Sequence, residues 1–284
     1  MTCQRWAYLT LIILLQLSCK SSKLPTTLGD PKNAQPFGYQ PLDPLPVHVH
    51  VNDLKKANSE KDLIPYTTRL MNSLPDETMR LAIGQVDANS NVSFVTAKLG
   101  YEGNSYVVIL DYIKFDTKSF STKIKRERNL QPKSKTDTIS IRFYPIVDNT
   151  VDVPDAVIPV YVGVGLRLTA TVTVNKGSVD LGNLFALGVA AESKQVTGTL
   201  VIQTLGISGS NISTIIPMPN EINTTTIQNA ILALGSIRAK MYESEVRVTP
   251  RIVGFYNTVG GGQASVNQFI STFLSGKPIE HDVD

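Results

Sequence analysis

The stretch IPVYVGVGLRLTATVTVN, residues 158–175, decides the fold class of this chain. The apolar residues of its second half occupy every other position: Leu166, Leu168, Ala170, Val172 and Val174. Arg167 and three threonines alternate with them. Because side chains of a strand point to its two faces in turn, this pattern predicts a long β-strand with one apolar face and one polar face. Gly163 and Gly165 would allow a bend or a bulge in it.

Further strand patterns are regularly spaced along the chain, separated by short polar breaks such as 88–90 and 102–104 that look like hairpin turns. They cover residues 79–87, 91–101, 105–115, 138–147 and 195–208. Because consecutive strands joined by short turns pair with each other, we expect an antiparallel meander.

Two amphipathic helices are predicted near the C-terminus, at residues 225–242 and 265–275. Thr225, followed by Gln228, is typical of a capping box, and the apolar residues after it recur at helical spacing. Segment 179–193 fits a helix and a strand equally well. The sequence therefore predicts a single α+β domain at residues 47–284, with a mainly antiparallel sheet and two amphipathic helices covering one face.

The N-terminus has the pattern of a signal peptide. Residues 6–17, WAYLTLIILLQL, are an apolar run shorter than the roughly 20 residues that a spanning helix needs. The following motif, Gln16-Leu17-Ser18-Cys19, resembles the lipobox of bacterial lipoproteins. This resemblance implies cleavage after residue 18 and lipidation of Cys19. An ordinary secreted protein and an uncleaved apolar N-terminus are the alternatives.

Residues 19–46 are expected to form a lipidated cysteine followed by a tether. Six prolines, at positions 25, 31, 36, 41, 44 and 46, disfavour a helix or a paired central strand and indicate an extended spacer. The lipid would hold the domain on the cell membrane or the outer membrane, on the periplasmic side or at the cell surface.

A basic segment, residues 118–135, contains seven basic residues and one acid. One hypothesis is contact with anionic lipid or polyanionic glycans. The candidate residues for this contact are Lys123, Lys125, Arg126 and Arg128. The alternative is a solvated long loop or a hairpin extension.

Composition and motifs do not favour nucleic-acid, metal or cofactor chemistry. The formal charge of +3 is small for 284 residues. No cysteine follows Cys19, and the three histidines, His48, His50 and His281, show no fixed third metal ligand. His281 belongs to a tail, KPIEHDVD, that we expect to be frayed. No serine-elbow or phosphate-loop motif occurs, and we expect a protein that is not an enzyme, without metal or cofactor.

Three functions remain open. The leading hypothesis is a lipid-anchored component of the cell envelope that binds or supports an envelope protein or glycan. The first alternative is an envelope glycan hydrolase with a carboxylate pair, Asp111 with Asp116 or Glu102. The second is a membrane-inserting, pore-forming-like effector, suggested by the amphipathic strands on either side of segment 179–193.

Overall fold

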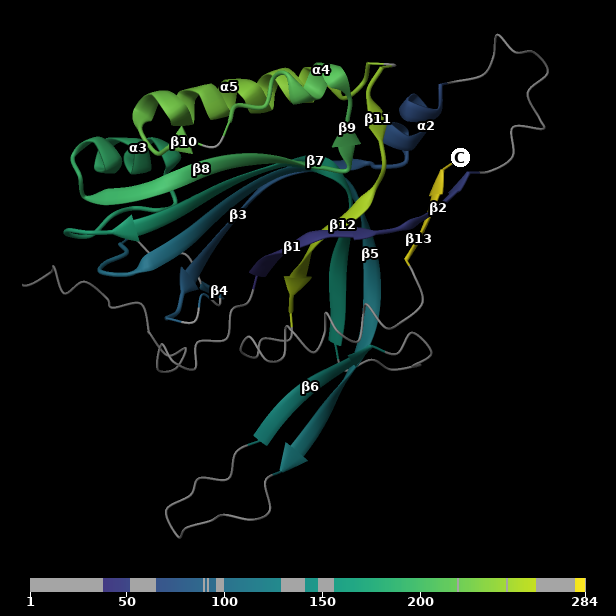
Figure 1. Ribbon diagram of the computed structural model, residues 1–284. Coiled ribbons are helices and arrows are strands. Elements are labelled where there is room, and N and C mark those ends of the chain that lie inside the picture. The colour runs from purple at the N-terminus through teal and green to yellow at the C-terminus, as the bar shows by residue number, and fades with distance from the viewer. Residues whose placement is uncertain are drawn as a thin grey trace, which may run out of the picture. The chain divides into compact units, whose positions relative to one another are not determined.

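A computed structural model describes residues 38–51, 65–88, 90, 92–95, 100–128, 141–147, 156–218, 220–243, 245–258 and 279–283 (Figure 1). Within these ranges the side chains of residues 93, 95, 121–128, 141–147 and 156 are not described. All described residues belong to one compact unit, Gln35–Asp284.

The described residues form an antiparallel sheet of nine strands together with several helices. This combination is an α+β fold. The main path through the sheet runs β1 (Gly38–Pro46), β12 (Arg251–Asn257), β7 (Ala156–Val174), β5 (Ser105–Arg128), β3 (Asp76–Val86) and β4 (Val92–Val95). Three strands join from the side: β6 (Ile141–Val147), β8 (Val196–Leu205) and β10 (Asn220–Glu221).

The long amphipathic strand predicted within residues 158–175 is β7, and its apolar face is buried as expected. It pairs with β5 without interruption, from Thr173 opposite Ser105 to Ala156 opposite Thr122. A Cβ atom at Gly165 would lie only 2.0 Å from the Tyr112 carbonyl oxygen of β5. The glycines of β7 therefore allow its backbone to lie close to that of β5. The bulge that they suggested is not in β7, because the register shift between β7 and β12 lies in β12, between Ile252 and Gly254.

The expected meander is wrong in two places, because β5 pairs with β3 past β4 and β7 pairs with β5 past β6. The turn at 88–90 joins β3 to β4 as predicted, but β5 pairs with β3 and not with β4. The eleven residues of β3 match the whole of 105–115, whereas β4 has four residues. A strand as short as β4 is suited to the sheet edge and cannot cover β5.

The segment 118–128 is strand and not loop. β5 continues to Arg128 and pairs there with β6, so that the two strands form the arm visible below the sheet in Figure 1. This backbone course agrees with the hairpin extension and leaves contact with an anionic surface as a hypothesis.

The expected spacer through Pro46 is wrong for residues 38–46, which form β1. β1 lies at the edge of the main path and pairs with β12, with a register shift between Pro41 and Leu45. Edge strands tolerate proline because one side of their backbone needs no partner, and a shift accommodates a residue without an N–H. Tyr39 and Leu42 are buried by this pairing.

Two helices cover one face of the sheet, above β7 and β8 in Figure 1. The ambiguous segment 179–193 contains a helix, α3 (Leu184–Glu192). The side chain of its N-cap residue, Asn183, accepts hydrogen bonds from the backbone N–H groups of Phe185 and Ala186. Helix α5 (Thr224–Lys240) is the helix predicted at 225–242, although its capping box uses Asn223 and Thr226. The helix predicted at 265–275 lies outside the described residues.

The remaining elements are short. They are α2 (Tyr66–Asn72), α4 (Ser210–Ser213), the antiparallel pair β9 (Ile207–Ser208) and β11 (Arg247–Val248), and the parallel pair β2 (His48–Val51) and β13 (Glu280–Val283). The expectation of a frayed tail is wrong for β13, because Val283 is buried in the main core. Among the described helices, none has the length and apolarity to cross a membrane.

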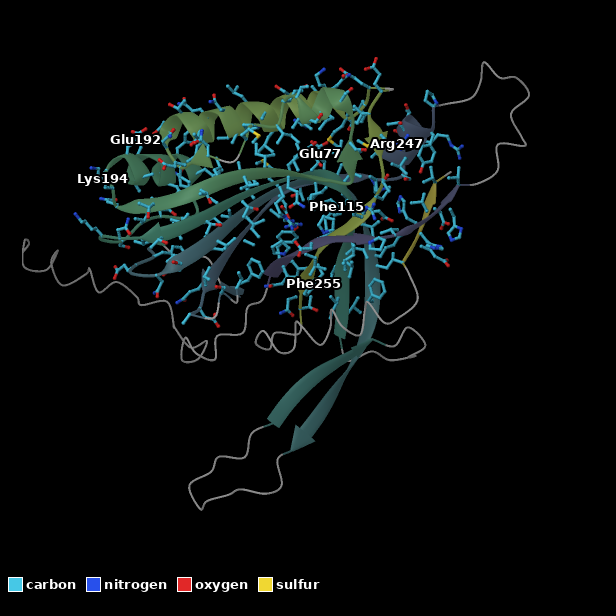
Figure 2. All side chains as sticks on the ribbon, in the orientation of Figure 1. Glu77, Phe115, Glu192, Lys194, Arg247 and Phe255 are labelled. Carbon is cyan, nitrogen blue, oxygen red and sulfur yellow. The ribbon has the colours of Figure 1, made fainter. Side chains whose placement is uncertain are left out.

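The main core lies between the sheet and its covering helices. The apolar face of β7 meets Ile227, Leu234 and Ile237 of α5 there. A smaller cluster on the opposite face packs around Ile113 and Phe115, and Figure 2 labels the latter.

Candidate ligand-binding cavity

A cavity of about 770 Å³ opens between the sheet strands β3 and β5 and the helices α3 and α5. Its size lies within the range of small-molecule pockets in proteins. Half of its lining residues are large and apolar: Met79, Leu81, Leu110, Leu184, Phe185, Ile231 and Leu234. The remainder are Glu77, Thr78, Tyr112, Gly182, Asn183, Gly235 and Arg238.

Gly235 is an exposed residue that lines the cavity on its helix side. It lies inside α5, and a Cβ atom built there would meet no heavy atom within 4 Å. Glycine inside a helix is less favourable than alanine by about 1 kcal/mol. The glycine of α3 differs, since a Cβ at Gly188 would lie 3.0 Å from the Thr224 Cα. Gly188 is therefore explained by helix packing, whereas Gly235 faces open space.

The mouth of the cavity is apolar. Met79 of β3 is 59% exposed and Phe185 of α3 is 53% exposed, although both line the cavity. Val189, one helical turn after Phe185, and Leu232 of α5 are exposed as well, although they do not line the cavity. Large apolar side chains grouped at an opening are typical of a site for an apolar ligand or partner.

A polar cluster of three side chains lies at one side of the cavity. Arg238 of α5 forms an ion pair with Glu77 of β3, at 2.5 Å between Nη2 and Oε1. Its Nε donates a hydrogen bond of 3.0 Å to the Tyr112 hydroxyl, and its guanidinium lies 5.5 Å from the centre of that ring. Burial, followed by the hydrogen bond to Glu77, raises the pKa of Tyr112. Figure 2 shows Glu77 beneath α5.

Comparisons with known proteins were made by family, by sequence and by structure. No family model, curated protein or solved structure matches this chain. The case for its function therefore rests on its own residues.

None of the predicted site residues is among the described residues that line this cavity. Cys19 lies outside the described residues. The backbones of Lys123, Lys125, Arg126 and Arg128 belong to the arm of β5 and pair with β6.

The proposed carboxylate pairs are not brought together. Asp111 and Asp116 are five residues apart on β5, which places them on opposite faces and about 16 Å apart along the strand. Glu102 lies before β5 begins, and its carbonyl oxygen accepts the hydroxyl of Tyr106. Asp111 and Asp116 are therefore too far apart for the carboxylate pair of a glycosidase.

Asp111 instead belongs to a buried ionic cluster. Arg167 of β7 donates from Nε and Nη2 to its two oxygens, each at 2.7 Å, and Tyr39 of β1 donates to Oδ2 at 2.5 Å. Arg167 also donates to the carbonyl oxygens of Leu42 and Val253. Burial, followed by the charge of Asp111, raises the pKa of Tyr39. This cluster joins β1 and β12 to the centre of the sheet.

Arg167 was expected on the polar face of β7, and it does lie on the face opposite Leu166. That face is covered here by β1, which the sequence did not predict, and the guanidinium is therefore buried and paired.

His281 is a second buried polar residue that sequence analysis missed. Its Nε2 lies 2.8 Å from the Ser73 hydroxyl, and its Nδ1 lies 3.6 Å from Asp116 Oδ2, too far for a hydrogen bond. Burial and the nearby charge of Lys118 lower its pKa. The ring is only 1% exposed and Ser73 donates to the Leu70 carbonyl oxygen, so the contact fastens β13 to α2.

The other two histidines lie side by side on β2. The rings of His48 and His50 are 6.3 Å apart, and His50 lies 3.8 Å from Glu280. Within the part of the chain that the structure describes, no three His, Cys, Asp or Glu residues are grouped to hold a metal ion.

Proposed function

We propose that this protein is a lipid-anchored component of the cell envelope that binds a small apolar or amphipathic molecule between its sheet and helices α3 and α5. The observation that carries this proposal is the open cavity of about 770 Å³ with its apolar lining. Burying apolar ligand surface against such a lining is the main source of affinity in pockets of this kind.

The side chains around the cavity suit binding without turnover. Among the described residues that line it there is no serine, cysteine or histidine, and its one carboxylate, Glu77, is paired with Arg238. Arg238, Glu77 and Tyr112 are held by contacts to each other. Such groups orient a ligand and give specificity.

A titration with N-phenyl-1-naphthylamine, a neutral dye that fluoresces in apolar sites, tests binding. The Gly235→Leu variant places a side chain in the open space and should lose most of the fluorescence. Ser236→Leu is the matched control, because Ser236 is the next residue of α5, is exposed and does not line the cavity. Equal fluorescence in wild type and Gly235→Leu would contradict the proposal.

The envelope address is tested separately. Cys19 would carry the lipid that brings the protein to the membrane, as the motif of residues 16–19 implies. Metabolic labelling with palmitate should mark the wild-type protein and leave Cys19→Ala unlabelled. Label remaining on the variant would refute the anchor.

An envelope protein or glycan is the partner that this address implies. Crosslinking in intact cells, with Phe185 replaced by a photoreactive residue, should capture a neighbour at the apolar mouth of the cavity. Crosslinks from an exposed residue remote from the mouth, Glu102, provide the comparison.

A further inference from the structure

We infer that the ligand of this cavity is an uncharged amphipathic molecule with a hydrogen-bond-accepting head group, of the chemical class of a monoacylglycerol. This inference rests on the proposed function and adds the chemistry of the ligand. It follows from the charge balance and the donor count of the residues that line the cavity.

The charges at the cavity cancel each other. Glu77 and Arg238 are the charged side chains among the described lining residues, and they form an ion pair with each other. A ligand carboxylate that approaches Arg238 would meet Glu77 beside it, and a ligand ammonium that approaches Glu77 would meet Arg238. Like charges placed together are unfavourable, so the balanced pair favours a neutral head group.

The polar groups left for a ligand are mostly donors. A guanidinium has five N–H groups, and Arg238 uses Nε for Tyr112 and Nη2 for Glu77. The Tyr112 hydroxyl accepts from Arg238 and hydrogen-bonds Glu77. Asn183 uses its side-chain oxygen as the cap of α3, and its NH₂ group takes no part in these cap hydrogen bonds. Remaining N–H groups of Arg238 and Asn183 match ester, hydroxyl or amide oxygens.

The apolar part of the ligand has a clear place. Leu81 and Leu110 on the sheet side and Ile231 and Leu234 on the helix side line the cavity, and Phe185 borders its mouth. An aliphatic chain fits such a lining because it needs no polar partner. The head group would then lie near Arg238, where α5 ends.

Calorimetric titrations with 1-lauroylglycerol and with laurate, both below their micelle concentrations, compare a neutral and an anionic head on the same chain. Wild type should bind 1-lauroylglycerol more tightly. Glu77→Gln leaves Arg238 without its carboxylate, and should improve laurate binding relative to 1-lauroylglycerol by roughly threefold to fivefold, the size expected for one exposed charge pair. Arg238→Gln should change this ratio in the opposite direction.

Glu102→Gln is the matched control, because it makes the same change of net charge at an exposed residue that does not line the cavity. It should leave the ratio unchanged. Equal binding of both lipids to wild type, with no change of ratio in Glu77→Gln or Arg238→Gln, would overturn the inference while leaving the cavity as a binding site. Failure of both lipids and of N-phenyl-1-naphthylamine to bind wild type would refute the proposed function itself.

Discussion

Replacement of Gly235 by alanine should stabilise the protein, which is an unusual outcome for a residue in the middle of a helix that packs on a core. A Cβ at this position would meet no heavy atom within 4 Å, so the new methyl group meets no steric cost. Alanine is favoured over glycine inside a helix by about 1 kcal/mol. The free energy of unfolding of Gly235→Ala should therefore rise by about 1 kcal/mol, and its Tm by roughly 2–4 °C.

The same change at Gly188 of α3 provides the control. There a Cβ would lie 3.0 Å from the Thr224 Cα and 3.1 Å from the Thr224 backbone nitrogen. Overpacking of this kind costs about 1–3 kcal/mol, which exceeds or matches the gain in helix propensity. Gly188→Ala should therefore leave stability unchanged or lower it by up to about 2 kcal/mol.

Urea unfolding followed by circular dichroism measures both variants against wild type. Opposite behaviour of the two glycines would show that α5 borders open space where α3 borders backbone. Destabilisation of Gly235→Ala by as much as Gly188→Ala would refute this reasoning, because it would mean that the space beside α5 is filled.

Three further predictions concern the stability of the fold. Asp111→Ala leaves the buried Arg167 guanidinium without its carboxylate and should lower the free energy of unfolding by roughly 3–5 kcal/mol in urea titrations, whereas Asp111→Leu combined with Arg167→Met should recover much of that loss. Burial lowers the pKa of His281, so the stability that this residue contributes is present above its unfolded pKa of about 6.5 and is lost as the pH falls. Hydrogen exchange, corrected for intrinsic rates, should therefore show weaker protection of β13 at pH 5.5 than at pH 7.5. His281→Gln should remove this difference. Asn223→Ala should cost about 1 kcal/mol in thermal unfolding because it removes the observed cap of α5, and Thr225→Ala should cost less.

The local patterns of the chain predicted most of its secondary structure. The alternation from Leu166 to Val174 gave β7, and the apolar spacing after Thr225 gave α5, because both signals depend on neighbours in sequence. Segment 179–193 was ambiguous since its residues are nearly all apolar or small, which removes both periodicities. In the structure Asn183 caps a helix that begins there at Leu184.

Contacts between distant residues decided what the sequence could not show. The prolines of 38–46 indicated a spacer, yet the edge of the sheet accepts them and Tyr39 reaches Asp111, 72 positions away. His281 appeared to lie in a frayed tail, but β13 pairs with β2 and brings its ring to Ser73. No local signal records either partner.

The cavity could not be predicted for the same reason. Its polar cluster joins Glu77 and Arg238, which are 161 positions apart, and its volume depends on how α3 and α5 pack on the sheet. Gly235, a glycine inside an otherwise strong helical pattern, is a local signal that could have pointed to this region, since such a residue often has a packing or functional reason.

Methyl NMR of the protein during titration with 1-lauroylglycerol tests the central claim most directly. The account predicts saturable shifts at the methyl groups of Leu81, Leu110, Ile231 and Leu234, which line the cavity. It predicts none at Ile158 and Val160, which belong to a separate cluster. Shifts confined to that second cluster, or none at any methyl group at saturating lipid, would contradict it.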